Sequence, residues 1–333
     1  NPTSIDDRVF VREYWLRYGR VDRRHRPLVP WAGYLQLGKA PRFAKQTVRQ
    51  LESYGLWGTA VDRFEIVQAQ LGLNLGGSLY LRAQAGIGAP LFMRDPNALA
   101  GDNGTFDRVP GFVNPTYKSG FPILYDARPK NFSTDGETEL GFGLGWRGAA
   151  EDGKRSLDAM LWYFERTLED APDIEGTFYQ GDLDLLRGAG LPLPFSGDRK
   201  WEAGLNLDWR LGQWLGFAQL VQQDIANLER RGFELETAFN IPVPPLFAAW
   251  DSPVLSWIRP ALRYSVIDND FAVTGPFITP SMFWDWRKLD LGLRIGIVAS
   301  SDLTIEYAFN ELELANGSTL EPNEWLVTWR VFW

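Results

Sequence analysis

Three absences narrow the possible classes of this protein. The chain has no cysteine, so it can form neither a disulfide framework nor a thiolate metal site. It has a single histidine, His25, so no site for catalysis or metal binding can use two histidines. No apolar run reaches the roughly 18 residues that a membrane helix needs. We therefore expect no disulfide, no metal site and no membrane-spanning helix.

Positive charge is also in short supply. Forty-two acidic against 34 basic residues give a formal net charge of -8 at pH 7. Nucleic-acid phosphates require a basic face, so nucleic acid is not an expected partner. No nucleophile–base set or phosphate-binding glycine loop is visible, and we expect neither enzyme activity nor a cofactor. His25 lies in the basic stretch 23–27, which reads as a solvated patch.

Aromatic residues, in contrast, are abundant. The chain has 15 Trp, 11 Tyr and 21 Phe among 333 residues. These numbers are high for a soluble domain. In a membrane β-barrel, aromatic side chains form girdles at the two membrane interfaces, and such girdles would account for them.

The last ten residues alternate between apolar and polar side chains. Because neighbouring side chains of a strand point to opposite faces, one face is wholly apolar. That face carries Trp325, Val327, Trp329, Val331 and Trp333. The pattern resembles the C-terminal assembly signal of bacterial outer-membrane proteins, which implies insertion by the barrel-assembly machinery.

The same period of two recurs along the chain. Residues 201–210 place Trp, Ala and Leu on one face, with Glu202, Asp208 and Arg210 on the other. Segments 67–73, 79–85 and 289–297 repeat it. Soluble sandwiches alternate too, but their apolar faces must pack on one another. The uniform pattern favours an all-β fold, a transmembrane antiparallel up-and-down β-barrel, as one domain over residues 1–333.

Link lengths predict the orientation. Short links near 75–78, 211–213 and 298–302 are expected on the periplasmic side, and long links 88–137, 167–198 and 268–284 outside. Besides the terminal strand, the predicted strands are 8–19, 30–38, 61–75, 77–87, 138–147, 155–166, 199–210, 213–224, 230–240, 256–267, 286–297 and 302–311. Thirteen is odd, whereas bacterial single-chain barrels have even numbers. We therefore expect one or three strands upstream of Asn1, giving 14 or 16 strands, with 16 favoured.

Two early segments carry a family resemblance. Residues 33–43 form a strand that ends in the pair Gly38-Lys39, followed closely by Pro41 and Phe43. With the preceding strand, residues 12–19, this hairpin resembles the porin O/P (phosphate-selective porin) family. The resemblance implies a water-filled channel and further strands upstream.

Charged residues on the polar faces are candidates for lining the pore. They are Arg82, Glu202, Asp208, Arg210, Arg259, Arg263, Lys288, Asp290, Arg294, Glu306 and Arg330, with Glu234 and Glu236 beside them. Rings of one sign would mark an ion-selective filter. Mixed signs instead predict weak charge selectivity, or ion pairs that only support the wall.

Loop 88–137 is long enough to be functional. Folded inward, it would form the constriction, and its cations Arg94, Arg108, Lys118 and Arg128 could then form an anion filter as the resemblance implies. Folded over the outside, it would be a lid or a trimer latch. Asp95, Asp102 and Asp107 offer oxygen ligands to calcium, but without EF-hand spacing we expect solvated turn residues and no metal.

Together these features predict a porin of the bacterial outer membrane that passes small hydrophilic solutes by diffusion. Its expected surroundings are the lipid bilayer, lipopolysaccharide and, in a homotrimer, copies of itself. The alternative is a scaffold barrel that encloses or is plugged by a partner protein. Small inward residues at Gly141, Gly143 and Gly145 would leave room for either water or a partner.

Overall fold

The computed structural model describes most of the chain, and every regular element in it is a β-strand. The described residues are 14–46, 49–53, 55–57, 65–87, 138–167, 190, 198–225, 227–249, 252–270, 285–298, 300–313, 317–321 and 323–331. Across these ranges, no helix has the length and apolarity to span a membrane.

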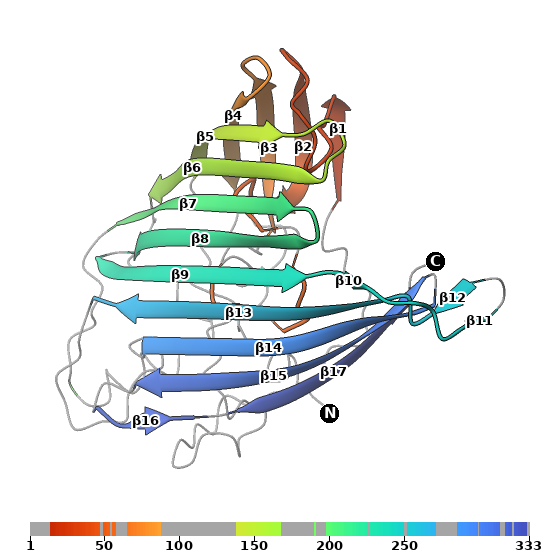
Figure 1. Ribbon diagram of the computed structural model, residues 1–333. Helices are drawn as coiled ribbons and strands as arrows, with labels where there is room; N and C mark the ends of the chain where they lie inside the picture. The colour runs from red at the N-terminus through yellow and green to blue at the C-terminus, as the bar shows by residue number, and fades with distance from the viewer. Residues whose placement is uncertain are drawn as a thin grey trace.

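The chain runs up and down through one antiparallel sheet (Figure 1). Its long strands are β1 (Tyr14–Gly19), β2 (Gly33–Pro41), β3 (Glu65–Asn74), β4 (Leu79–Ile87), β5 (Glu139–Ala149), β6 (Arg155–Thr167), β7 (Arg199–Leu211), β8 (Trp214–Ile225), β9 (Leu228–Phe239), β13 (Trp257–Asn269), β14 (Asp285–Val298), β15 (Ser301–Glu313) and β17 (Glu324–Val331). Each strand pairs with its predecessor in this series. The predicted all-β, up-and-down fold is confirmed.

Four short strands complete the architecture. β10 (Ile241–Pro242) follows β9 and pairs with the same partner, β13. β16 (Thr319–Leu320) and β17 both pair with β15, so they are two parts of one strand. β11 (Phe247–Ala249) and β12 (Ser252–Val254) form a separate hairpin. The described residues thus supply thirteen successive strands, and a total of 14 or 16 stays a prediction.

Burial in this sheet is inverted with respect to a soluble protein. Outward leucines are exposed, for example Leu161 at 61% and Leu71 at 52%. Inward polar side chains are buried, and Gln219 and Glu234 are both at 0%. Strand pairing keeps like faces together, since Gln36 lies beside Gln70 and Gln70 beside Gln84. A sheet with its apolar face outward suits lipid, because its backbone hydrogen bonds are made between strands.

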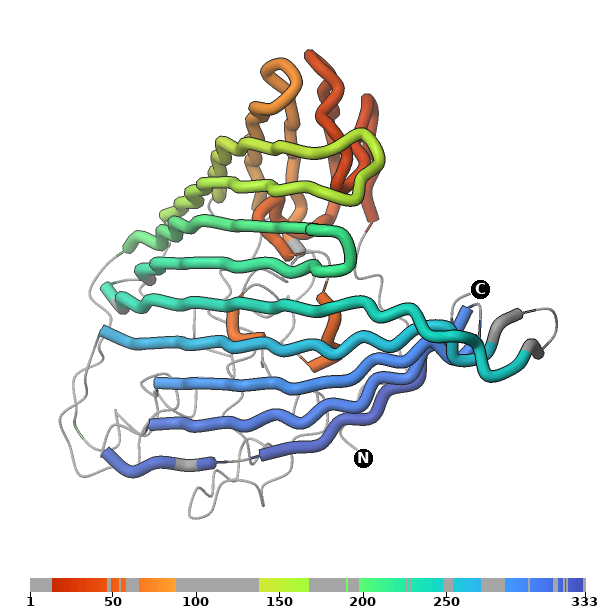
Figure 2. The backbone as a smooth tube through the Cα atoms, viewed as in Figure 1, coloured from red at the N-terminus to blue at the C-terminus, as the bar shows by residue number. Residues whose placement is uncertain are grey.

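The sheet curves around its polar face (Figure 2). β1–β4 turn away from the later strands, and the described pieces of residues 49–57 lie on the concave side. We call this concave polar side the lumen. Strand twist of constant hand produces such curvature in antiparallel sheets.

The expectation that every tight link lies at one end is wrong in one place. The links β3–β4, β5–β6, β7–β8 and β14–β15 are short and lie at the same end. The link between β8 and β9 is also tight but lies at the opposite end, whereas the long link with β10–β12 lies at the short-turn end. Asn227 explains the tight link, because it adopts a left-handed φ of 70° and its N–H donates to the Asp224 carboxylate at 2.9 Å.

The outward face generates a prediction about depth in the membrane. Arginine at Leu205, in the middle of β7, should lower the free energy of unfolding by about 2–4 kcal/mol, because it places a charge near the bilayer midplane. Leu211→Arg is the matched control on the same face of the same strand, where the interface reduces the cost to about 0–1 kcal/mol. Folding titrations into lipid vesicles measure both, and equal costs would contradict a membrane strand.

Candidate functional site: the lumen

A segment between β2 and β3 enters the lumen and packs on the far walls. Its described residues are 42–46, 49–53 and 55–57, and we call them the inward segment. Their contacts reach β5–β7 at one end and β9 and β13–β15 at the other. The segment therefore lies inside the lumen, against the inward faces of these strands.

Arg42 anchors the first end of the inward segment. Its Nε donates to Glu139 Oε1 at 2.8 Å, and its guanidinium also pairs with Glu202. Lys200 reaches the same Glu202 carboxylate at 3.1 Å. The Arg42 guanidinium lies 4.5 Å from the centre of the Phe164 ring. All four charged groups are buried, so each neutralises charge that burial would otherwise make unfavourable.

Backbone amides anchor the second end on three wall carboxylates. The bonds run from Gln50 N to Glu236 at 2.5 Å, from Ser53 N to Glu306 at 3.1 Å and from Trp57 N to Glu234 at 2.7 Å. These N–H groups have no strand partner, and carboxylates accept hydrogen bonds strongly. The wall glutamates thus serve as the hydrogen-bond acceptors that the segment's backbone needs.

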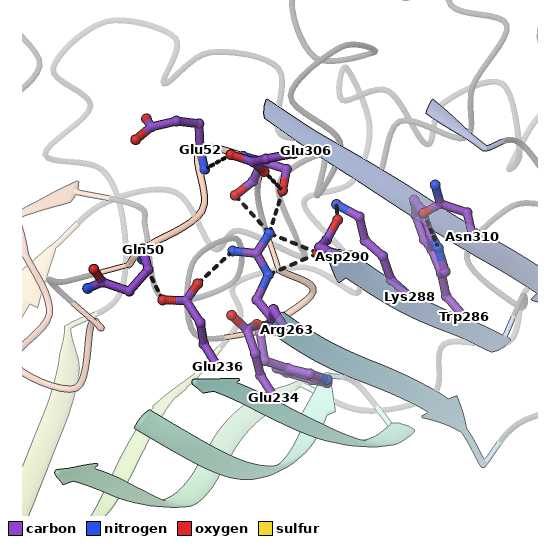
Figure 3. A network of polar contacts seen from close by, with 12 residues as sticks. Gln50, Glu52, Glu234, Glu236, Arg263, Trp286, Lys288, Asp290, Glu306 and Asn310 are labelled. Atoms are coloured by element: carbon purple, nitrogen blue, oxygen red, sulfur yellow. Dashed lines mark hydrogen bonds and ion pairs between the residues drawn. The ribbon is translucent and has the colours of Figure 1, made fainter. Parts of the chain in front are cut away.

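Arg263 is the centre of this second anchor (Figure 3). It donates to Asp290 Oδ2 at 2.9 and 3.0 Å and to Glu236 Oε2 at 3.2 Å. It also donates to Ser53, at 2.9 Å to the carbonyl oxygen and 2.6 Å to Oγ. Lys288 supplies a second cation, 3.3 Å from Asp290. The four wall groups are fully buried and joined to the segment in one network.

Glycines on the inward face receive the apolar side chains of the segment. A Cβ at Gly292 would overlap Leu51, and one at Gly232 would overlap Trp57. Gly143 likewise faces Phe43. Trp57 Nε1 completes its site by donating to the Val266 carbonyl at 2.9 Å. The small residues thus make close approach of the segment possible.

The space predicted beside the β5 glycines is already filled. Phe164 occupies the place of a side chain at Gly141, and Tyr80 does so at Gly145. With Phe43 beside Gly143, the wall itself and the inward segment take up this room.

The predicted charges divide into two groups. Five are buried in the anchors: Glu202, Arg263, Lys288, Asp290 and Glu306. The other six lie nearer the short-turn end of their strands and keep some exposure: Arg82, Asp208, Arg210, Arg259, Arg294 and Arg330. In this second group Arg294 and Arg330 share Asp302, at 2.7 and 3.2 Å.

Other predicted residues have different positions. Trp325, Val327, Trp329 and Val331 are outward and exposed, whereas Trp333 lies outside the described residues. The loop candidates Arg94, Arg108, Lys118 and Arg128, and the calcium candidates Asp95, Asp102 and Asp107, also lie outside them. Within the described part of the chain, no group of three or more His, Asp or Glu side chains is arranged to hold a metal ion.

Sequence reasoning missed Arg42, Glu139 and Lys200. Lys200 and Glu139 follow the inward parity of β7 and β5, so periodicity could have found them. Arg42 lies after a strand, where periodicity gives no direction.

The link between β1 and β2 crosses the short-turn end of the lumen. Arg24 pairs with Asp208 of β7, and His25 Nδ1 lies 2.8 Å from Ser156 Oγ of β6. Arg23 and Arg26 are exposed, as predicted for a solvated patch, but His25 is largely buried. The solvated reading of His25 is therefore wrong, because the link leans onto wall strands that follow much later in the sequence.

His25, Ser156 and Asp208 are the residue types of a hydrolytic triad, but their geometry differs from one. Asp208 Oδ1 lies 3.6 Å from His25 Nδ1, the same nitrogen that faces Ser156. In a triad the carboxylate and the hydroxyl use opposite ring nitrogens. Burial lowers the pKa of His25, as do Arg24, Arg210 and Arg147, whereas Asp208 raises it. The arrangement is thus a neutral contact at pH 7.

The second anchor predicts unequal costs for two arginine substitutions. Arg263→Ala should lower stability by about 3–5 kcal/mol, because it leaves Glu236 and Asp290 buried without their cation. Arg287→Ala is the control, since its pair with Glu311 is exposed and such pairs contribute at most about 1 kcal/mol. The temperature at which the folded band disappears on detergent gels measures both. Similar shifts would show that the anchor adds nothing to stability.

The lowered pKa of His25 predicts a titration below the ordinary value of about 6.5. Because the pKa of His25 is lower in the folded than in the unfolded protein, the unfolded protein binds the proton more readily. The free energy of unfolding therefore decreases as the pH falls from about 6.5 through the folded-state pKa. Asp208→Asn should lower the midpoint further, because it removes the one group that raises it. As the chain has a single histidine, the ring C–H resonance in an NMR titration needs no assignment. A midpoint above 6.5 would contradict the burial.

Comparison with known proteins supports the fold. Neither a family model nor a curated protein matches the sequence. Among solved structures, OprB of Pseudomonas putida is similar over 95% of this chain and 70% of its own, at 11% identity and a TM-score of 0.51. The outer membrane channel DcaP of Acinetobacter baumannii is similar over 90% and 73%, at 12% identity and a TM-score of 0.49. The chain shares the fold of OprB.

Proposed function

We propose that this protein is an outer-membrane porin through which small hydrophilic solutes and ions diffuse passively. The observation that carries the proposal is the inverted burial of the sheet, with leucines exposed outward and charged or amide side chains inward. Lipid is the solvent that such an outward face fits, and the channel fold agrees with it. The bacterial outer membrane is accordingly its location.

The mechanism follows from a closed barrel of 14 or 16 strands. The inward segment is anchored on β5, β13 and β15 and therefore narrows the lumen. Solutes larger than the remaining opening are excluded. The wall carboxylates that hold it are bonded to its amides and to Arg263. Electrostatic bias therefore comes from the charges that the segment leaves uncovered.

The remaining partners belong to the same proposal. The exposed face with Trp325, Val327 and Trp329 supports contact with lipid and recognition by the barrel-assembly machinery. A homotrimer and lipopolysaccharide contact are in keeping with a porin. Against the scaffold alternative, the glycine-lined space is filled by the chain's own Phe43 and Phe164.

Planar bilayers test the function directly. The purified protein should insert in discrete conductance steps with an approximately ohmic current, because water fills the remaining lumen. Complete electrical silence of correctly folded protein would contradict the porin and favour the scaffold barrel.

The inward segment predicts the direction of a change in conductance. Replacing residues 49–57 with a glycine–serine linker should increase the single-channel step, since the anchor on Glu234, Glu236 and Glu306 is lost. Leu211→Arg, at the outward membrane edge, is the control and should leave the step unchanged. An unchanged or smaller step for the linker variant, with the folded band intact on gels, would show that the segment is no constriction.

A further inference from the structure

One side of the lumen carries a continuous series of alternating aromatic and arginine side chains. The series passes through Trp15 and Arg17 of β1, Tyr34 of β2, Arg82 and Tyr80 of β4, and Arg147 of β5. We call these six residues the ladder. All six lie on the inward parity of their strands, because Arg17 pairs with Gln36, and Arg82 with Gly72 and Gly143.

Every step of the ladder places a guanidinium over a ring. The Cζ-to-centroid distances are 4.7 Å for Arg17 and Trp15, 4.9 Å for Arg17 and Tyr34, 5.4 Å for Arg82 and Tyr34, 4.4 Å for Arg82 and Tyr80, and 5.9 Å for Arg147 and Tyr80. All lie within the roughly 6 Å over which cation–π attraction acts. The rings therefore hold three cations in a row. One carboxylate, that of Asp158, pairs with Arg147 at one end of the ladder and accepts a hydrogen bond from Tyr80.

The three arginines of the ladder differ in the number and charge of their hydrogen-bond partners. Arg17 donates through Nε to Gln36 at 2.7 Å, and Arg147 pairs with Asp158 at 2.5 Å. Arg82 is in the middle, and among the described residues its one hydrogen-bond acceptor is the Leu81 carbonyl of its own strand, at 2.8 Å. A guanidinium has five N–H donors, so Arg82 retains several for a ligand.

The ladder and the inward segment lie on parts of the wall that overlap at β5. The anchors of the segment are on β5–β7, β9 and β13–β15, whereas the ladder lies on β1, β2, β4 and β5. Trp15 is 46% exposed, and Arg17 and Arg82 are half-buried. A solute that passes the segment therefore meets these side chains.

We propose that the ladder is a binding site for small organic carboxylates that carry a flat apolar body. A carboxylate matches the guanidinium fork in two parallel hydrogen bonds, and a flat ring matches the neighbouring aromatic faces. Phosphate would use the cations but leave the rings without contact. A neutral sugar would use the rings without the charge. This inference rests on the proposed channel, whose solute class it specifies.

Blocking of the ion current by four probes tests the site. Benzoate has both the ring and the carboxylate, acetate has only the carboxylate, benzyl alcohol has only the ring, and inorganic phosphate has only the charge. Benzoate should block half of the current at the lowest concentration. Phosphate or benzyl alcohol blocking at lower concentrations than benzoate would overturn the proposal.

Variants identify the residues. Arg82→Gln should raise the half-blocking concentration of benzoate about tenfold, as expected for one lost charge-assisted hydrogen bond. Tyr34→Leu should weaken benzoate and leave acetate unchanged. Arg155→Gln, on an exposed outward arginine at the same end, is the matched control and should change neither. An unchanged benzoate block in Arg82→Gln would overturn the site.

Calorimetry separates this proposal from the porin itself. Benzoate titrated into the detergent-solubilised, folded protein should bind, and Arg82→Gln should weaken that binding by the same factor. Binding that depends on Arg82 without any conductance would contradict the porin function and support the binding site. Conductance without such binding would support the porin function and contradict the binding site. A folded band on gels confirms that each variant has folded.

Discussion

The placement of polar side chains on the concave face is the constraint on which the rest of this structure depends. Hydrogen bonds between strands satisfy the backbone, so the outward face needs no polar group and can consist of Leu161, Leu71 and similar residues. Away from the ends of the strands, charged side chains therefore turn inward. The lumen therefore collects carboxylates and cations at a density that requires pairing.

The inward segment solves part of this pairing problem. Removing a carboxylate from water is unfavourable unless hydrogen bonds and opposite charges replace the water. The Glu236 carboxylate accepts hydrogen bonds from the Gln50 amide and from Arg263, and the Glu306 carboxylate accepts one from Ser53. In return, a segment without strand partners obtains acceptors for its N–H groups. The same contacts that stabilise the wall thus fix the position of the inward segment in the lumen.

Because the anchors concentrate on one part of the wall, the two sides of the lumen differ chemically. Around Arg263, the cations pair directly with buried carboxylates. On the other side, Arg17 and Arg82 lie over aromatic rings, and Arg147 lies over a ring and pairs with Asp158. A ring supports a cation without neutralising it. Selectivity can therefore arise on the ladder side of the lumen.

The sequence by itself determined the thirteen long strands and the alternation of their two faces, because a period of two is a local property of extended backbone. It predicted β7 and β14, their outward leucines and the inward Glu202, Arg263 and Asp290. Only the tertiary structure decided which segment fills the lumen. Arg42 meets a carboxylate 160 positions away and Ser53 one 253 positions away, and no local pattern encodes such pairs. The curvature of the sheet brings them together, as it also brings His25 to Ser156, because strands distant in sequence face each other across a common interior.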